Sequence, residues 1–160
     1  VYLAGVNAGF VTYLVVSREH RNRQLGRKLR SSLVESFRAN ALAANYEELN
    51  WVLGEVRIDS PWLITLVKTG QVVPFDLEYF HPGLQPGVTD KRYVLYREIV
   101  SDGRRSIPAD ETARILYAIY RRAYRVRYPL ERENFKSMIA QLEGRDEIGP
   151  NPEVLRLAKS

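Results

Sequence analysis

The chain has 160 residues, 45% hydrophobic and 27% charged, which suits one folded domain or one domain with an appendage. Lysine and arginine outnumber aspartate and glutamate by 24 to 19, and this formal charge of +5 favours an anionic partner. The absence of cysteine excludes disulfides, a thiolate zinc site and a cysteine nucleophile, and with only two histidines we expect no bound metal.

The first residues do not form a membrane or export signal. The longest mainly apolar stretch, residues 1–16, is too short to cross a membrane and is interrupted by Asn7. It also lacks the basic start and the small-residue cleavage site of a signal peptide. We therefore expect a cytoplasmic protein without a membrane partner. Because the first residue is Val1 rather than methionine, we also expect a missing N-terminal portion.

Residues up to about 101 alternate between strand-like and helix-like patterns. A turn at 7–9 separates residues 1–3 from 10–17, both rich in β-branched and aromatic residues, which predicts a β-hairpin. Apolar residues recur every four positions from Leu25 to Ala41, which predicts an amphipathic helix that ends near Asn45. The next expected elements are a strand, a short helix and two strands, over residues 51–58, 60–70, 72–79 and 92–100.

After Asp102 the pattern becomes helical. A broad apolar face over residues 108–126 predicts a helix, and Tyr128-Pro129 ends it. A second helix is expected over 130–142, and we expect the tail from Asp146 to be loose, with at most a short helix over 153–158. The sequence thus predicts an α/β body over residues 1–101 and a helical extension, folded as a hairpin, over 102–160.

The start of the first helix is unfavourable unless a ligand binds there. Gly26 lies in its first turn, where glycine costs about 1 kcal/mol relative to alanine. Positive charges at a helix N-terminus cost about 0.3–1 kcal/mol each. An anion docked there would explain both features, because backbone N–H groups and the helix dipole bind phosphate; a solvated basic helix end is the alternative. The basic residues concerned are Arg21, Arg23, Arg27, Lys28 and Arg30.

The segment Arg21-Asn22-Arg23-Gln24-Leu25-Gly26 resembles the pyrophosphate-binding loop of the GNAT acyltransferases, whose pattern is Arg/Gln-x-x-Gly-x-Gly/Ala. Arg21 and Gly26 match, and Gln24 stands where the family usually has its first glycine. Residues 59–70 resemble a later family element, Asn-x-x-Ala…Gly-Phe, with aspartate for asparagine and a glutamine in place of the phenylalanine. The order strand, loop, helix, strand, helix, strand, strand over residues 1–100 is also similar.

The resemblance implies a GNAT-like mixed, mostly antiparallel sheet flanked by helices, without the family's usual N-terminal strand and helices. It implies acetyl-CoA or acyl-CoA as the acyl donor. The backbone of Leu14, Val15 and Val16 would receive the pantetheine arm where strand 12–17 diverges from strand 51–58, with Asp59 near that arm. The residues that would hold the pyrophosphate are Arg21, Asn22, Arg23, Gln24, Leu25, Gly26 and Arg27.

Amine attack on a thioester needs a base for the amine proton and an acid for the leaving thiolate. The family often supplies the acid from a tyrosine at the position that Leu66 occupies here, so Tyr79 and Tyr13 are the substitute candidates. Glu55 is the candidate base, because partial burial raises the pKa of a carboxyl group; an outward-facing strand glutamate is the alternative. Both histidines are interpreted as loop residues without a catalytic role.

The sequence therefore predicts an acyltransferase that moves an acetyl or acyl group from coenzyme A to a small-molecule amine acceptor by direct attack. Two alternatives stay open. A tunnel lined by Leu33, Phe37 and Trp62 would favour an N-acyltransferase that takes a long acyl chain from an acyl carrier protein. The loss of the tyrosine at Leu66 favours a non-catalytic acyl-CoA-binding module.

Partners are expected at the sheet edge and at the C-terminal helices. An exposed edge promotes aggregation, so a preceding segment, a partner chain in a homo-oligomer, or the helical hairpin is expected to cover it. Arginines alternate with tyrosines over residues 114–128, which would suit an acidic carrier protein or nucleic acid. Such a helix more often packs its tyrosines and solvates its arginines, which disfavours nucleic acid.

Overall fold

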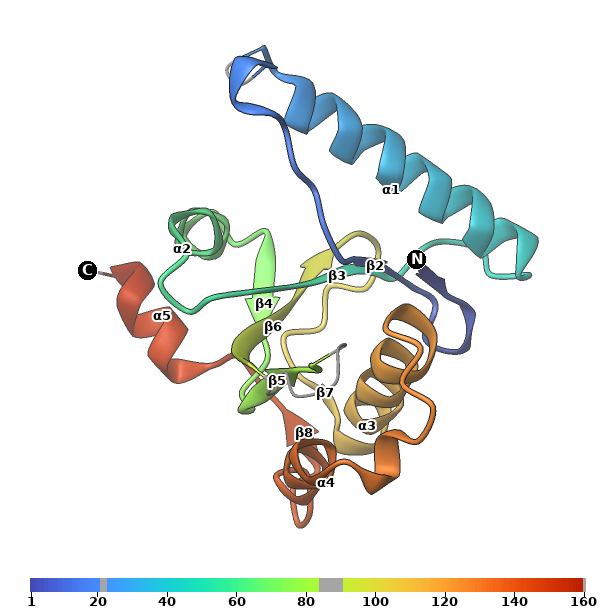
Figure 1. Ribbon diagram of the computed structural model, residues 1–160, viewed down its shortest axis with the longest axis vertical. Coiled ribbons are helices and arrows are strands. Elements are labelled where there is room, and N and C mark those ends of the chain that lie inside the picture. The colour runs from blue at the N-terminus through green and yellow to red at the C-terminus, as the bar shows by residue number, and fades with distance from the viewer. Residues whose placement is uncertain (21–22, 84–90, 160) are drawn as a thin grey trace.

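The computed structural model describes residues 1–20, 23–83 and 91–159. Within those residues the chain forms a six-stranded sheet in the order β1-β2-β3-β6-β4, and β5 also pairs with β6 (Figure 1). Only β2 and β3 are parallel, so the sheet is mixed and mostly antiparallel, as predicted. The strands are β1 (Tyr2–Leu3), β2 (Ala8–Val11), β3 (Trp51–Val56), β4 (Val72–Pro74), β5 (Tyr79–His81) and β6 (Lys91–Ile99).

The N-terminal hairpin is shorter than the sequence predicted. β1 and β2 pair antiparallel around the 3-10 turn Ala4–Val6, but β2 ends at Val11 and residues 12–17 lie outside any strand. Tyr13 and Val15 are 74% and 76% exposed. β-Branched and aromatic residues favour a strand only where a neighbouring strand offers pairing, and pairing with β3 stops at Val11. The segment runs instead from the sheet through the 3-10 turn Arg18–His20 toward α1 (Figure 1).

Helix α1 (Leu25–Ala43) is attached to the sheet mainly through its second half. Phe37 and Ala41 are buried in a cluster with Leu49 and Val52. Gly9 of β2 makes room for this contact, since a Cβ there would lie 2.0 Å from the Phe37 ring. The first half of α1 extends away from the sheet, and Leu29 is 48% exposed (Figure 1). The predicted apolar stripe is therefore buried only toward the C-terminal end of the helix.

Helices α2 (Pro61–Lys68) and α5 (Pro152–Lys159) cover the same face of the sheet as α1. Val154 of α5 is fully buried against Leu63 of α2 and Val72 of β4. The tail after Asp146 is therefore packed and not loose, whereas the short helix expected over 153–158 is present. A short helix with one apolar face is only marginal by itself, and contact with α2 stabilises it.

The strand expected over residues 72–79 is divided into β4 and β5. Proline at 74 is the last residue of β4, and the Phe75 N–H still donates to the carbonyl of Leu95 in β6 over 2.9 Å, while the backbone that follows pairs with the C-terminal segment. Phe75 forms a bridge to Pro150, and the Asp76 N–H donates to the carbonyl of Gly149 over 3.0 Å. This detour lets β5 re-enter the sheet and places His81 at its end.

The opposite face of the sheet is covered by the helices of residues 109–140. α3 (Ala109–Ala118) continues into a π-helical turn, Ile119–Ala123, and α4 (Glu133–Ala140) follows a 3-10 turn, Pro129–Glu131. The predicted second helix over 130–142 is thus shorter than expected. A small ribbon of β7 (Ile107–Pro108) and β8 (Glu147–Ile148) joins the two ends of this segment.

One hydrophobic cluster joins the sheet to these helices. It contains Leu53 and Leu95 from the sheet together with Leu116, Tyr120 and Phe135 from the helical segment. Residues 102–160 therefore share the main core with residues 1–101. Among the helices described, none has the length and apolar character needed to cross a membrane.

Candidate functional site

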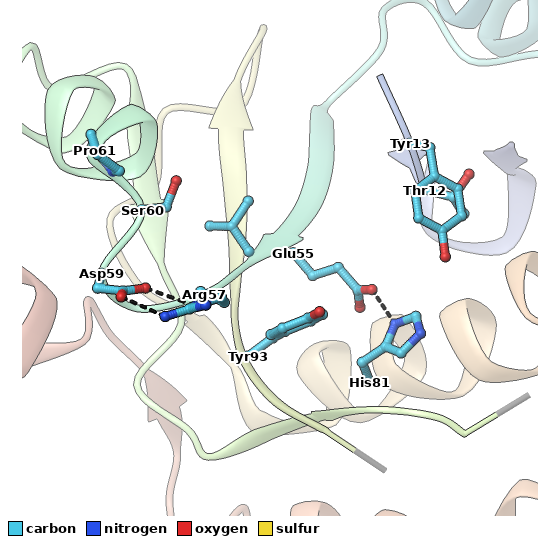
Figure 2. Close-up of a pocket in the computed structure, with 10 residues that line it drawn as sticks. Thr12, Tyr13, Glu55, Arg57, Asp59, Ser60, Pro61, His81 and Tyr93 are labelled. Atoms are coloured by element: carbon cyan, nitrogen blue, oxygen red, sulfur yellow. Dashed lines mark hydrogen bonds and ion pairs between the residues drawn. The ribbon is translucent and has the colours of Figure 1, made fainter. Parts of the chain in front are cut away.

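A cavity of about 580 Å³ opens where β2 and β3 separate (Figure 2). The two parallel strands pair from Ala8 with Trp51 to Val11 with Gly54, and β3 then continues without β2 beside it. The cavity walls include Thr12 and Tyr13 after β2, Glu55 on β3, His81 at the end of β5 and Tyr93 on β6. The separation of the strands therefore creates a space bordered by a buried carboxylate, an imidazole and two phenols, with a second carboxylate, Asp59, at the rim.

Glu55 and His81 form a buried pair at one wall of this cavity. The Nδ1 atom of His81 hydrogen-bonds to Glu55 Oε1 (Figure 2). The Glu55 side chain is only 4% exposed, and that of His81 is 15% exposed. Because Trp51, Leu53 and Glu55 alternate along β3, Glu55 points toward the face covered by α3, as its two buried neighbours do. The sheet thus buries a carboxylate among apolar groups and gives it a histidine partner.

A third side chain, Tyr124, reaches the same carboxylate from the C-terminal segment. Its hydroxyl donates to Glu55 Oε1 over 2.5 Å. Tyr124 follows the π-helical turn, and its N–H donates to the Ile119 carbonyl five positions earlier. Arg125, with a φ of 56°, ends the helix directly afterwards. Burial is the main cause that raises the pKa of Tyr124 above its usual range. The negative charge of Glu55 and the hydrogen bond to Glu55 raise this pKa further.

Aromatic rings hold the imidazole of His81 on two sides. The Tyr124 ring meets it edge-on, with ring centres 4.8 Å apart at 83°. The Tyr93 ring lies at 5.5 Å and 49°. Phe10 in turn packs against Tyr124 at 5.6 Å. The ring is therefore fixed by packing as well as by its hydrogen bond.

Tyr79, the first candidate for the catalytic acid, lies beneath the site and not in the cavity. It is 0% exposed, and its hydroxyl has no hydrogen-bond partner among the described residues. Burial, followed by the negative charge of Glu55, raises the pKa of Tyr79 well above its usual range. A group that cannot reach a substrate cannot protonate it, so this placement contradicts the expected role. The second candidate, Tyr13, lines the cavity and is largely exposed.

Asp59 lies at the rim of the cavity, before α2. Its carboxylate accepts two hydrogen bonds from Arg57, at 3.0 and 2.7 Å (Figure 2). The hydrogen bond from Arg57 is the main cause that lowers the pKa of Asp59. Both side chains are well exposed, at 74% for Arg57 and 63% for Asp59. Asp59 thus lies at the rim of the cavity, with its charge matched by Arg57.

The predicted phosphate-binding residues lie at the other end of the segment that leaves β2. Arg21 and Asn22 fall outside the described residues. Gln24, directly before Leu25 and the start of α1, has a φ of 57°, in the left-handed region. Gly26 is unobstructed, since a Cβ there would meet only Val16 Cγ2 at 3.7 Å. The other predicted residues of this region, all at least partly exposed, are Leu14, Val15, Arg23 and Arg27.

The sequence analysis missed two members of the site. His81 was interpreted as a loop residue and Tyr124 as one of several helix tyrosines, but both bind Glu55, from 26 and 69 positions away. One local signal was present for His81, since alternation in Tyr79-Phe80-His81 puts the histidine on the buried side with Tyr79. No comparable signal identified Tyr124, because the π-helical turn that positions it has no sequence pattern we recognised.

The described residues contain no group of three histidines or carboxylates that could hold a metal ion. No protein-family model matches this chain, and no curated protein or solved structure matches it either. The function must therefore be argued from the site.

Proposed function

We propose that this protein is a GNAT-like acyltransferase that moves an acetyl or acyl group from coenzyme A to an amine. The observation that carries the proposal is the separation of the parallel strands β2 and β3 directly over a cavity that contains a buried carboxylate–histidine pair. The resemblance in sequence anticipated such a separation between these two segments. The position of this strand separation next to Glu55 links binding of the acyl donor to the acyl-transfer reaction.

An acyl-coenzyme A is elongated, with the thioester at one end and the pyrophosphate nearer the other. The segment from Thr12 to Gln24 connects the cavity to the start of α1, so one such molecule would lie along it. Gln24 supports the loop assignment, because its left-handed backbone is the conformation that glycine adopts most readily and the family has glycine there. Exposed Arg23 and Arg27 supply positive charge beside the helix N-terminus.

The reaction would proceed in one complex. The amine nitrogen forms a bond to the thioester carbonyl carbon, the carbon–sulfur bond breaks, and the amine proton passes to the Glu55–His81 pair. The thiolate takes a proton from Tyr13 or from solvent. Leu66 does not supply this proton, because it is aliphatic and packs with the apolar cluster beneath α2.

The experiment that tests this function is calorimetric titration with acetyl-CoA and with a long-chain acyl-CoA, comparing Gly26→Asp with Gly26→Ala. An aspartate near the helix N-terminus stabilises the fold by about 0.3–1 kcal/mol, so Gly26→Asp should fold normally. It should nevertheless lose at least about tenfold in coenzyme affinity, because it repels the pyrophosphate. Gly26→Ala, whose methyl group fits, should keep the affinity. Equal binding by both variants would disprove the loop assignment.

A non-catalytic acyl-CoA-binding module is the second candidate, favoured by the packing of Leu66 away from the cavity. Coenzyme binding without transfer to any amine would support it. The carrier-protein alternative gains no support from its proposed tunnel. Leu33 and Phe37 pack between α1 and the sheet. Trp62 on α2 instead contacts Tyr96, with the ring centres 5.5 Å apart.

A further inference from the structure

We propose that His81 is the catalytic base of this site, and that Glu55 and Tyr124 are positioning residues that hold His81 in the tautomer able to accept a proton. The catalytic role rests on the proposed function, whereas the tautomer follows from the three side chains alone. No sequence pattern connects the three residues, since they come from β3, β5 and the end of the π-helical turn.

Burial decides which of the two groups receives the proton. Glu55 is 4% exposed, and its Oε1 is already engaged by both Tyr124 and His81. Its second oxygen, Oε2, is buried and has no hydrogen-bond partner among the described residues. His81 lines the cavity together with Glu55 and is the more exposed partner. A substrate in the cavity therefore has better access to the imidazole than to the carboxylate.

The hydrogen bonds determine the tautomer of His81. A carboxylate only accepts, so the Nδ1 atom that contacts Glu55 carries the hydrogen. In the neutral ring Nε2 is then an unprotonated acceptor, on the side of the ring away from Glu55 (Figure 2). No described residue hydrogen-bonds to Nε2. This is the arrangement of a general base whose orientation is set by a carboxylate.

Tyr124 keeps Glu55 in the acceptor role. Its hydroxyl donates to the oxygen that also contacts His81, and its ring packs edge-on against the imidazole. Without that hydroxyl the carboxylate could rotate and release Nδ1. Because Tyr124 is positioned by the π-helical turn and by Arg125 in the left-handed region, the helical segment contributes directly to the site.

Few charged groups face His81. Glu55 is the carboxylate in contact with it, and the neighbouring rings are neutral phenols. Farther along the cavity wall Arg57 is paired with Asp59. The negative charge of Glu55 therefore stabilises the imidazolium that forms as Nε2 takes the proton. The phenols that surround the ring or line the cavity are Tyr13, Tyr93 and Tyr124.

In the step proposed, the lone pair of the amine attacks the thioester carbonyl carbon. The proton on nitrogen passes to His81 Nε2 as the carbon–nitrogen bond forms, and the electron pair of the carbon–sulfur bond leaves on sulfur. The thiolate takes its proton from Tyr13 or from solvent, and the imidazolium returns its proton to the group that supplied it, which restores the neutral ring. No oxidant, reductant or metal is needed for this balance.

Nitrogen NMR of the imidazole tests the tautomer without any assay of activity. The chain has two histidines, so His20→Gln leaves His81 as the single signal. In neutral His81 we expect hydrogen on Nδ1 and none on Nε2. Glu55→Gln and Tyr124→Phe should each change the tautomer balance of this signal. Hydrogen on Nε2, or a signal insensitive to both changes, would overturn the positioning roles.

Steady-state kinetics with acetyl-CoA and an amine tests the catalytic role. His81→Gln should lower kcat by about 10²–10⁴-fold, the usual contribution of a general base, with acetyl-CoA affinity unchanged. His20→Gln should match the parent. Glu55→Gln should lower kcat less than His81→Gln does and shift the acidic limb of the pH profile. If Glu55→Gln is the more damaging change, Glu55 is the base and the proposal is wrong.

Failure of the two proposals can be told apart. If the parent protein neither binds acetyl-CoA nor transfers its acyl group, the proposed function and the catalytic role of His81 are both refuted. The NMR result then still decides whether Glu55 and Tyr124 fix the tautomer. If the parent transfers acetyl groups and His81→Gln does so equally well, with its circular dichroism unchanged, only the further inference is refuted.

Discussion

Gln24 adopts a backbone conformation that favours glycine. Its φ of 57° lies in the left-handed region, which costs a residue with a side chain about 1–2 kcal/mol. Gln24→Gly should therefore stabilise the protein by a few tenths to about 1 kcal/mol in urea denaturation. Gln71→Gly, at another exposed glutamine outside the left-handed region, is the matched control and should destabilise it. A loss of stability in both variants would show that the left-handed backbone at Gln24 carries no strain.

The hydroxyl of Tyr79 should make the free energy of unfolding depend on pH in the alkaline range. Its folded-state pKa is raised well above 10, so the phenol stays neutral in the folded protein and ionises in the unfolded chain near pH 10. Above about pH 10 the unfolded state therefore holds fewer protons than the folded state. The contribution of Tyr79 to the free energy of unfolding is fully present below about pH 10 and falls by up to about 1.4 kcal/mol for each further pH unit.

Tyr79→Phe provides the measurement. Because the hydroxyl is buried without a partner among the described residues, its removal should be nearly neutral at pH 7. Urea denaturation between pH 9 and pH 11 should show a shallower loss of stability in the variant than in the parent. If the proposed acyl transfer is measured, the variant should have the same rate as the parent, since the hydroxyl does not reach the cavity. If the free energy of unfolding falls equally steeply with pH in the variant and in the parent, Tyr79 is not the source of the alkaline pH dependence.

Individual elements depend on their neighbours to different degrees. The second half of α1 packs on the sheet, and in its first half Arg30 forms an ion pair with Glu98 of β6. Arg30 was expected to serve an anion at the helix start, but its guanidinium is directed toward the sheet. The positive charge available to a phosphate at this end is therefore smaller than the sequence suggested.

The short helix α5 tests how much a single buried side chain contributes. Val154 is 0% exposed between α2 and β4, so Val154→Ala should cost about 1–3 kcal/mol in urea denaturation. Leu157→Ala, on the same helix but 38% exposed, should change stability by no more than about 0.5 kcal/mol. Similar losses in the two variants would mean that α5 does not pack as described.

At the scale of the whole molecule, the sheet and the C-terminal helices share one core. A chain of residues 1–101 would expose Leu53 and Leu95 on the face that α3 and α4 cover. We expect this fragment to show no cooperative thermal transition by circular dichroism. In the full chain, fluorescence of buried Trp51 and half-exposed Trp62 should follow the same transition as circular dichroism. A cooperatively folding fragment would restore the two-part organisation.

The site has the same dependence on the whole chain. Glu55 comes from the sheet and Tyr124 from the helical segment, so the carboxylate–histidine pair would lose one of its donors in the shorter fragment. The C-terminal segment thus completes both the core and the candidate catalytic site. This explains why an interpretation confined to residues 1–100 identified Glu55 and missed Tyr124.

The sequence by itself determined the local elements and their order. The four-residue spacing from Leu25 to Ala41 correctly indicated α1, and the strand and turn patterns predicted a mixed α/β chain. Glycine and proline correctly marked the ends of α2 and the break before α4. These features depend on residues close together in the chain, where spacing and backbone preference act directly.

Only the tertiary structure decided which residues meet. The loss of strand pairing after Val11, the docking of α5 and the contacts of Glu55 with His81 and Tyr124 all depend on surfaces far apart in sequence. Strand propensity cannot predict the absence of a partner strand, and a helix pattern cannot predict a π-helical turn that redirects a tyrosine. The physical reason is that burial and pairing are properties of two surfaces, and a local sequence describes only one of them.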